Sequence, residues 1–338
     1  MSITTRPAAL LFAAAALFAN SAEAQDCKLT EMSSLPMGFT SGGHLSVPVT
    51  INGTAQNMIV EPGSPIGEVT QKLVDTLGLK VHSLSEATSR NPVMRYGPFY
   101  LGNGEHAKYM TQIESLTIGM ERASYTEFIV NPYLSDDNGA LAGALGFDIW
   151  NHFDLDFDFG AGKLNLFSPE HCAGKVVYWS PAAYVELSMS QTPTGAIGAT
   201  MTLDGHDVDA TLDVGSDTTI MTLPEARAAY GIDEHSPGVE ALTENGQTIY
   251  RTHFKTLTLS GIAVTNPEIY LVPDKVGEQA RKDVQDQKLN GYQGNEGIAM
   301  PHLTVGLNVL RRLHLYVAYE EHKIYATAAD AHDGASPH

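Results

Sequence analysis

The chain has 338 residues, of which 20 are basic and 39 are acidic, so its formal net charge is −19 at pH 7. This charge argues against binding to nucleic acid or anionic lipid and is typical of an acidic surface that keeps an exported protein soluble, with a basic partner as the alternative explanation. Hydrophobic residues make up 43% of the sequence, and the length suits two domains that each bury a core.

The first 24 residues have the pattern of a secretory signal peptide. Arg6 precedes an apolar run from Ala8 to Ala19, and small residues stand at Ala22 and Ala24. The run is too short to span a bilayer, and no later stretch is long and apolar enough to do so. We therefore expect cleavage after the leader and export to the periplasm or the medium, with no membrane span.

The sequence contains two cysteines, Cys27 and Cys172, and both follow the leader. In an oxidising compartment, an isolated pair without histidine at ligand spacing favours a disulfide over a metal site. We predict a Cys27–Cys172 bond that ties the mature N-terminus to the middle of the chain. Two free buried thiols are the alternative.

Most of the remaining chain has the alternating or β-branched patterns of strands, separated by Asn-Gly, Asp-Gly and proline turns. The sequence therefore predicts a mainly β fold. Helices are predicted at Glu68–Leu77 and Pro224–Tyr230, each ending near a glycine that can cap it, Gly78 or Gly231. The predicted strands are 44–51, 57–61, 115–120, 127–130, 155–159, 163–167, 198–203, 210–213, 255–259, 268–272 and 313–319.

One segment of the chain occurs twice. The stretch INGTAQNMIVEPGSP at 51–65 matches LDGHDVDATLDVGSD at 203–217, which gives Glu61 and Asp213 equivalent positions, each with Gly-Ser two residues later. The correspondence continues to a late glycine in each copy, Gly146 and Gly306. This order predicts two equivalent halves and a polar tail. We place the halves at 39–168 and 183–327, with a tail at 328–338 that we expect to be disordered.

Each predicted half also contains a hairpin signal between its acid and its late glycine. The signal is Gly102-Asn103-Gly104 in one half and Asn245-Gly246 in the other. Asn-Gly favours the positive φ angles of a tight hairpin turn. These residues therefore predict a β flap in each half, with ordinary strand connections as the alternative.

The paired motifs resemble those of the retropepsin-like and pepsin-like aspartic peptidases, in particular bacterial exported proteins that fuse two retropepsin-like halves. Each half has an apolar strand that runs into acid-x-Gly-Ser, a short helix, and an apolar-Gly motif followed by Phe-Asp-x-Asp-Phe or its counterpart. The resemblance implies a bilobal, pepsin-like architecture of two β-barrel halves, without a cofactor. It also implies that Asp213 and Glu61 form a catalytic pair and that an extended peptide or protein substrate lies in the cleft between the lobes. The residues expected to contact that substrate are Gly63, Gly215, Asn103, Gly104, Asn245 and Gly246.

The chemistry of such a pair depends on a shared proton. Two carboxylates close together cannot both ionise cheaply, so one keeps a proton while the other acts as base on a water. This chain departs from the family's Asp-Thr/Ser-Gly motif, because Pro62 and Val214 lack the hydroxyl that normally locks the two loops together. Glu61 also adds a methylene, which moves its carboxylate by about 1 Å, more than catalytic geometry tolerates.

These departures favour peptide hydrolysis that is weak or lost on a preserved fold. The alternatives are a competent peptidase, a non-catalytic protein that binds a peptide or another ligand, and a structural envelope component. For Glu61 and Asp213 individually, stabilisation of a turn is the alternative role. The Asp-rich stretch 154–160 and the histidines follow no metal-binding pattern, so no metal is expected.

Overall fold

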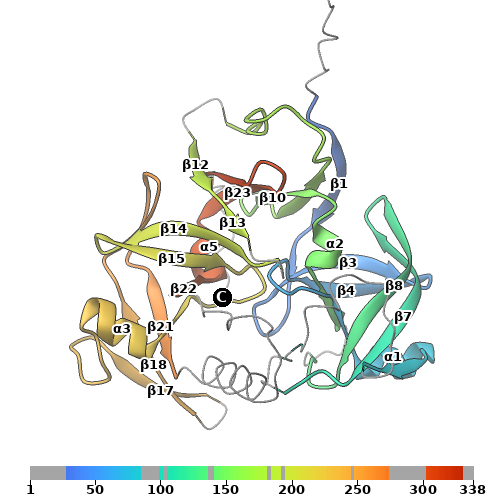
Figure 1. Ribbon diagram of the computed structural model, residues 1–338, viewed down its shortest axis with the longest axis horizontal. Helices are drawn as coiled ribbons and strands as arrows, with labels where there is room; N and C mark the ends of the chain where they lie inside the picture. Colours follow the sequence, from blue (N-terminus) through green and yellow to red (C-terminus); the bar gives the residue numbers. More distant parts are fainter. Residues whose placement is uncertain are drawn as a thin grey trace, which may run out of the picture.

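The computed structural model describes residues 28–84, 99, 101, 105–135, 141–180, 184–191, 195–244, 247–273 and 302–329. Within these residues the fold is mainly β, as the sequence predicts. Figure 1 shows two sheets side by side, one coloured blue to green and the other yellow to orange, with a third sheet across the top. We call them the first sheet, the second sheet and the shared sheet.

The first sheet has the strand order β2-β3-β4-β9-β5-β8-β7-β6. β4 and β9 are parallel, and so are β5 and β8, whereas β5 and β9 are antiparallel. Because β4 and β9 run in the same direction, the residues that follow them lie at the same edge of the sheet. The strands are β2 (Gly38–Phe39), β3 (Leu45–Ile51), β4 (Thr54–Val60), β5 (Glu68–Thr70), β6 (Val81–Ser83), β7 (Tyr109–Ile118), β8 (Glu121–Asn131) and β9 (Leu141–Leu145).

The second sheet repeats this arrangement around its own central strands. β15 is parallel to β22, β16 is parallel to β21, and β16 is antiparallel to β22. The duplicated sequence therefore corresponds to a duplicated topology. The strands are β13 (Ser190–Gln191), β14 (Ile197–Leu203), β15 (His206–Leu212), β16 (Ile220–Thr222), β17 (Glu240–Glu244), β18 (Gln247–His253), β19 (Thr256–Leu259), β20 (Ile262–Thr265), β21 (Glu268–Val272) and β22 (Leu303–Val305).

The shared sheet takes strands from both ends of the chain, in the order β1-β11-β10-β23-β24-β12. Its centre is the antiparallel pair β10 and β23, in which Leu155 lies opposite Val317. One buried hydrophobic cluster contains Val60 of the first sheet, Leu212 of the second and Leu315 of the shared sheet, so the three sheets have a continuous core. The strands are β1 (Glu31–Pro36), β10 (Asp154–Asp158), β11 (Lys163–Phe167), β12 (Val185–Ser188), β23 (Leu313–Ala318) and β24 (Lys323–Ala328).

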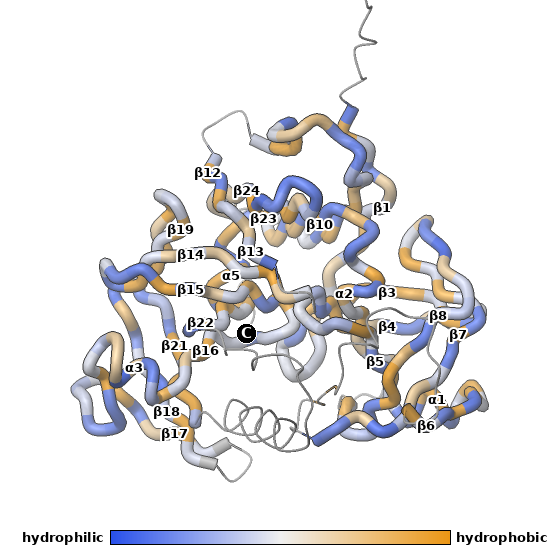
Figure 2. Tube along the Cα trace, viewed as in Figure 1, coloured by the Kyte–Doolittle hydropathy of each residue, from blue (hydrophilic) through white to orange (hydrophobic). Residues whose placement is uncertain are grey.

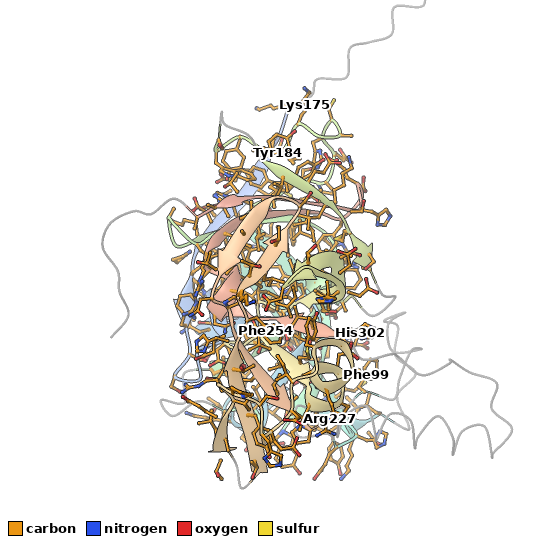
Figure 3. All side chains as sticks on the ribbon, turned by 90° about the vertical axis from the view of Figure 1, so that its left-hand side faces the viewer. Phe99, Lys175, Tyr184, Arg227, Phe254 and His302 are labelled. Atoms are coloured by element: carbon orange, nitrogen blue, oxygen red, sulfur yellow. The ribbon has the colours of Figure 1, made fainter. Side chains whose placement is uncertain are left out.

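Side-chain patterning agrees with these layers. Hydrophobic and hydrophilic stretches alternate along the strands in Figure 2, and in β14 buried residues alternate with more exposed ones along the whole strand. This period of two is the pattern of a strand with one face toward a core. In Figure 3, which looks onto the second sheet, Lys175 and Tyr184 lie at the top of the molecule and Arg227 at the opposite end.

The segment 168–180 covers the shared sheet with a buried polar layer. His171 Nε2 lies 2.6 Å from Asp154 Oδ2, and His314 Nε2 lies 2.6 Å from Asp156 Oδ1. Both aspartates are fully buried, and the Trp179 ring stacks on the His314 imidazole with centroids 4.0 Å apart. The connection between the repeated parts is therefore packed against the molecule and is not a free tether.

The predicted disulfide cannot be placed, because Cys27 lies outside the described residues. Its expected partner Cys172 lies in the segment 168–180. The Ser168 N–H donates a 2.9 Å hydrogen bond to the carbonyl of Thr30, the residue before β1. The start of β1 therefore lies beside the segment 168–180. The Cys27–Cys172 bond stays a prediction.

The helices differ in part from the sequence prediction. The helix expected from Glu68 begins later, at α1 (Gln71–Leu77), because Glu68–Thr70 pair with β8 and β9 as the strand β5. α3 (Leu223–Tyr230) agrees closely with its prediction. Two short helices were not predicted, α2 (Phe147–Trp150) and α5 (Leu307–Leu310). In the described part of the chain, no helix combines the length and apolar character needed to cross a membrane.

The start of α1 gives a testable expectation. Thr70 Oγ1 accepts a 3.1 Å hydrogen bond from the Leu73 N–H, which satisfies one of the free donors of the first turn. Replacing Thr70 with Ala should lower the free energy of unfolding by about 1 kcal/mol, whereas Thr70→Ser keeps the acceptor and should cost less. Urea unfolding of both variants measures the difference, and equal losses would mean that the cap contributes nothing.

Candidate active site

The two candidate acids leave the sheets at equivalent points. Glu61 directly follows β4, and Asp213 directly follows β15. The Glu61 N–H donates a 3.0 Å hydrogen bond to the Leu145 carbonyl at the end of β9, and the Asp213 N–H donates a 2.9 Å bond to the Val305 carbonyl at the end of β22. Each acid is therefore fixed where two parallel strands end together.

The loops that follow the acids are held by the two short helices. The Phe147 N–H at the start of α2 donates to the Ser64 carbonyl at 2.7 Å, and the Leu307 N–H at the start of α5 donates to the Ser216 carbonyl at 2.8 Å. Gly306, just before α5, lies against the loop that follows Asp213, so that an added Cβ would be 2.1 Å from the Thr218 carbonyl oxygen. The late glycines thus let the helix ends press against the acid-bearing loops.

Gly215 is the point at which the two acids come together. A Cβ built on Gly215 would lie 3.2 Å from Asp213 Oδ1 and 3.3 Å from Glu61 Oε2. A Cβ built on Gly63, the equivalent glycine, would meet nothing within 4 Å. The longer Glu61 side chain therefore reaches across to the loop of Asp213, and the pair is centred on the second loop. We call Glu61 and Asp213 the carboxylate pair.

The environment of Glu61 favours its protonated form. Burial raises the pKa of Glu61 to about 8, and the negative charges of Asp213 and Glu68 act in the same direction. Among the described residues, none donates a hydrogen bond to the Glu61 carboxylate. Glu61 therefore holds a proton across the acid and neutral range.

Asp213, unlike Glu61, has hydrogen-bond donors that stabilise its ionised form. Burial raises the pKa of Asp213 above its ordinary value as well, and the N–H groups of Gly215 and Ser216 and the charge of His44 offset part of this rise. The Gly215 N–H lies 3.0 Å from Asp213 Oδ1. Because the donors that the described residues supply face Asp213 and not Glu61, Asp213 is the member of the pair that ionises first.

Two further ionisable residues, His44 and Glu68, were missed by the sequence analysis. His44 Nδ1 makes a short hydrogen bond with the Gly215 carbonyl, and Glu68 Oε2 accepts a 2.6 Å bond from Asn131 Nδ2. Burial raises the pKa of Glu68. The repeat gives no signal for either residue, since their equivalents in the second copy are Ala196 and Ile220.

A turn at residues 39–44 carries His44 to the second loop. Arg311, which follows α5, donates from Nη2 to the Gly43 carbonyl at 3.2 Å and lies 4.0 Å from the centroid of the Phe39 ring. Gly43 has φ +82° and is packed so closely that an added Cβ would be 2.8 Å from Asp217 Cβ. A residue with a side chain at position 43 would therefore push the turn away from the second loop.

Pro62 and Val214, which stand where the peptidases that the sequence resembles have hydroxyl residues, are both buried. The hydroxyls of Ser64 and Ser216 bond within their own loops, to the carbonyls of Ile66 at 3.2 Å and Thr218 at 3.0 Å. The loops are thus tied to the rest of the fold by backbone bonds, and the second loop also by the 39–44 turn.

The predicted flap residues Asn103, Gly104, Asn245 and Gly246 lie outside the described residues. The chain on either side of each turn is paired. The Leu101 N–H donates to the Glu105 carbonyl at 2.8 Å, and Glu244 lies opposite Gln247 where β17 meets β18. Contact of either turn with a substrate stays a prediction.

Other features of the described residues do not form a second reactive centre. Within the described ranges, no group of three or more His, Cys, Asp or Glu side chains is arranged to hold a metal ion. A hollow of about 870 Å³ lies beside β8 and α2, and its lining residues include neither Glu61 nor Asp213. No protein-family model matches this chain, and a comparison with curated proteins finds no similar sequence.

Proposed function

We propose that the protein is an aspartic-type peptide hydrolase in which Glu61 and Asp213 activate a water together. The observation that carries this proposal is that both carboxylates lie against Gly215, while the hydrogen-bond donors found among the described residues are directed to Asp213 and not to Glu61. A half-buried pair with unequal surroundings is the arrangement that separates an acid from a base.

The repeated topology supports a pepsin-like architecture of two equivalent lobes. Each sheet supplies one acid after its own parallel strand pair, and the shared sheet joins the two sets of strands. The exported location belongs to the same proposal and depends on the leader at residues 1–24, which lie outside the described residues. An extended peptide or protein would lie between the lobes.

The mechanism follows from the proton distribution. Ionised Asp213 takes a proton from a water, whose oxygen forms a bond to the peptide carbonyl carbon, while protonated Glu61 donates its proton to the carbonyl oxygen. The tetrahedral intermediate then collapses: one of its two hydroxyl groups returns a proton to Glu61 and becomes the new carbonyl, the C–N bond breaks, and the leaving nitrogen takes the proton held by Asp213. Because the reaction needs protonated Glu61, we expect activity to fall as the pH rises through about 8.

The residues that depart from the family motif, Glu61, Pro62 and Val214, affect the expected rate of peptide hydrolysis. The reach of Glu61 to Gly215 offsets its different length, since Gly63 faces open space and the pair forms on the other loop. Pro62 and Val214 still provide no hydroxyl to hold the loops in register. We therefore expect turnover that is slow for a two-carboxylate peptidase.

The test is cleavage of an unfolded protein substrate from acid to neutral pH. We expect wild-type turnover, and we expect Asp213→Ala to reduce it by at least about a hundredfold, because general base catalysis is lost. Asp209→Ala is the matched control, since Asp209 is an exposed aspartate on the same strand, β15. Equal activity in all three proteins would assign the cleavage to a contaminant.

A triple variant separates hydrolysis from binding. The substitutions Glu61→Asp, Pro62→Thr and Val214→Thr restore the family motif. Activity that appears only in this variant would contradict hydrolysis by the natural chain and favour a non-catalytic peptide-binding protein. If neither the wild type nor the triple variant cleaves the substrate, the proposed peptide hydrolysis is contradicted.

A further inference from the structure

The contact between His44 and Gly215 joins two segments that are far apart in the chain. His44 ends the 39–44 turn, just before β3 of the first sheet, whereas Gly215 lies in the loop after β15 of the second sheet. A carbonyl oxygen can only accept a hydrogen bond, so His44 Nδ1 carries a hydrogen and donates it.

Gly215 is the residue through which His44 reaches both acids. The Gly215 N–H donates a 3.0 Å hydrogen bond to Asp213 Oδ1. The Cα of Gly215 faces the Glu61 carboxylate, since a Cβ built on Gly215 would lie 3.1 Å from Glu61 Cδ. A hydrogen bond that fixes the Gly215 carbonyl therefore fixes the orientation of a peptide unit beside each carboxylate. A ring charge in this place also stabilises a nearby anion more than a neutral acid.

We propose that His44 is a positioning residue of the carboxylate pair: it anchors Gly215 and sets a basic ring next to the loop of Asp213, so that Asp213 becomes the base and Glu61 the acid. This assignment of roles depends on the proposed hydrolysis, whereas the electrostatic link between His44 and Asp213 does not. The position has no cation in the other copy, where Ala196 is the equivalent residue. The cation therefore makes the two loops unequal.

The charged groups around Asp213 are few among the described residues. Glu61 approaches from the loop after β4, and Glu68 stands behind it on β5. Asp217 lies further along the loop of Asp213 and interacts with the guanidinium of Arg311. Arg311 is already engaged with the Gly43 carbonyl and the Phe39 ring. His44 is the cation whose charge acts on Asp213 itself.

Three variants separate the hydrogen bond from the charge. His44→Gln keeps an N–H donor without a ring charge, His44→Ala removes both, and His82→Gln is the control, since His82 is exposed on the distant strand β6. For His44→Gln we expect the acid limb of the kcat/KM profile to move to higher pH. For His44→Ala we expect the same movement and a loss in kcat/KM of about tenfold to a hundredfold from the released loop. His82→Gln should match the wild type.

A second readout needs no catalysis. Carboxyl carbon NMR of the wild type and of the three variants, labelled at aspartate, follows the titration of Asp213 directly, with the Asp213→Ala spectrum identifying its signal. We expect Asp213 to titrate at higher pH in both His44 variants. An unchanged titration in His44→Gln would overturn the proposal, whether or not the wild type cleaves peptides. A shifted titration in a protein without turnover would keep the His44–Asp213 link and reject the hydrolysis.

Discussion

The free energy of unfolding should fall as the pH rises from about 5 to about 9, and Glu61→Gln should remove much of that fall, on the order of 3 kcal/mol. Burial raises the pKa of Glu61 from 4.5 to about 8 in the folded protein. Between these values the unfolded chain has lost the proton that the folded protein keeps, so raising the pH favours the unfolded chain. Glutamine has nearly the same shape as glutamate and does not ionise, so in Glu61→Gln the free energy of unfolding loses the pH dependence that comes from ionisation at position 61.

The experiment is chemical unfolding, followed by circular dichroism, at acid, neutral and alkaline pH. Glu114→Gln is the matched control because Glu114 is exposed on β7. Part of the fall should persist in Glu61→Gln, since burial also raises the pKa values of Glu68 and Asp154. The same pH slope in the wild type and in Glu61→Gln would show that Glu61 is not buried next to Asp213.

Gly306→Ala should destabilise the protein by more than about 3 kcal/mol, at or beyond the upper end of ordinary overpacking. An added Cβ would lie 2.1 Å from the Thr218 carbonyl oxygen and 2.4 Å from the Thr218 carbonyl carbon. These are backbone atoms, which cannot move aside by a change of rotamer. The Gly306 N–H also donates to Thr219 Oγ1 at 3.1 Å, so the loop of Asp213 must shift with the clash.

Gly63→Ala is the control for this substitution, because a Cβ at Gly63 meets no atom within 4 Å. It should change the free energy of unfolding by less than about 1 kcal/mol. Both variants are compared by urea unfolding and by soluble yield. A Gly306→Ala protein as stable as Gly63→Ala would contradict the close packing of α5 on the second loop.

Local patterns predicted eleven of the 24 strands that the structure describes, and they did not predict how the strands assemble. Alternation identifies segments such as 44–51 and 198–203, because one face of each is buried. The start of α1 was misplaced because Glu68–Thr70 have no strand pattern of their own and become β5 only between β8 and β9. α2 and α5 have four residues each, too few to display a helical period.

The candidate site was predictable to the extent that it repeats. Glu61, Asp213 and the glycines behind them occur in both copies of the motif and could be aligned. His44 and Glu68 occur in one copy only, and Arg311 follows α5 without any pattern that links it to residues 39–44. Contacts between parts that lie far apart in the chain leave no periodic signal, so their detection required the fold.

The polar layer over the shared sheet limits how the molecule can move as a whole. Many two-domain proteins open by rotating one domain about a flexible connection. Here such a rotation would separate β10 from β23, part His314 from the fully buried Asp156, and lift the segment 168–180 off both. The two halves are therefore joined through a shared buried layer, and a rotation that separates β10 from β23 would have to break that layer.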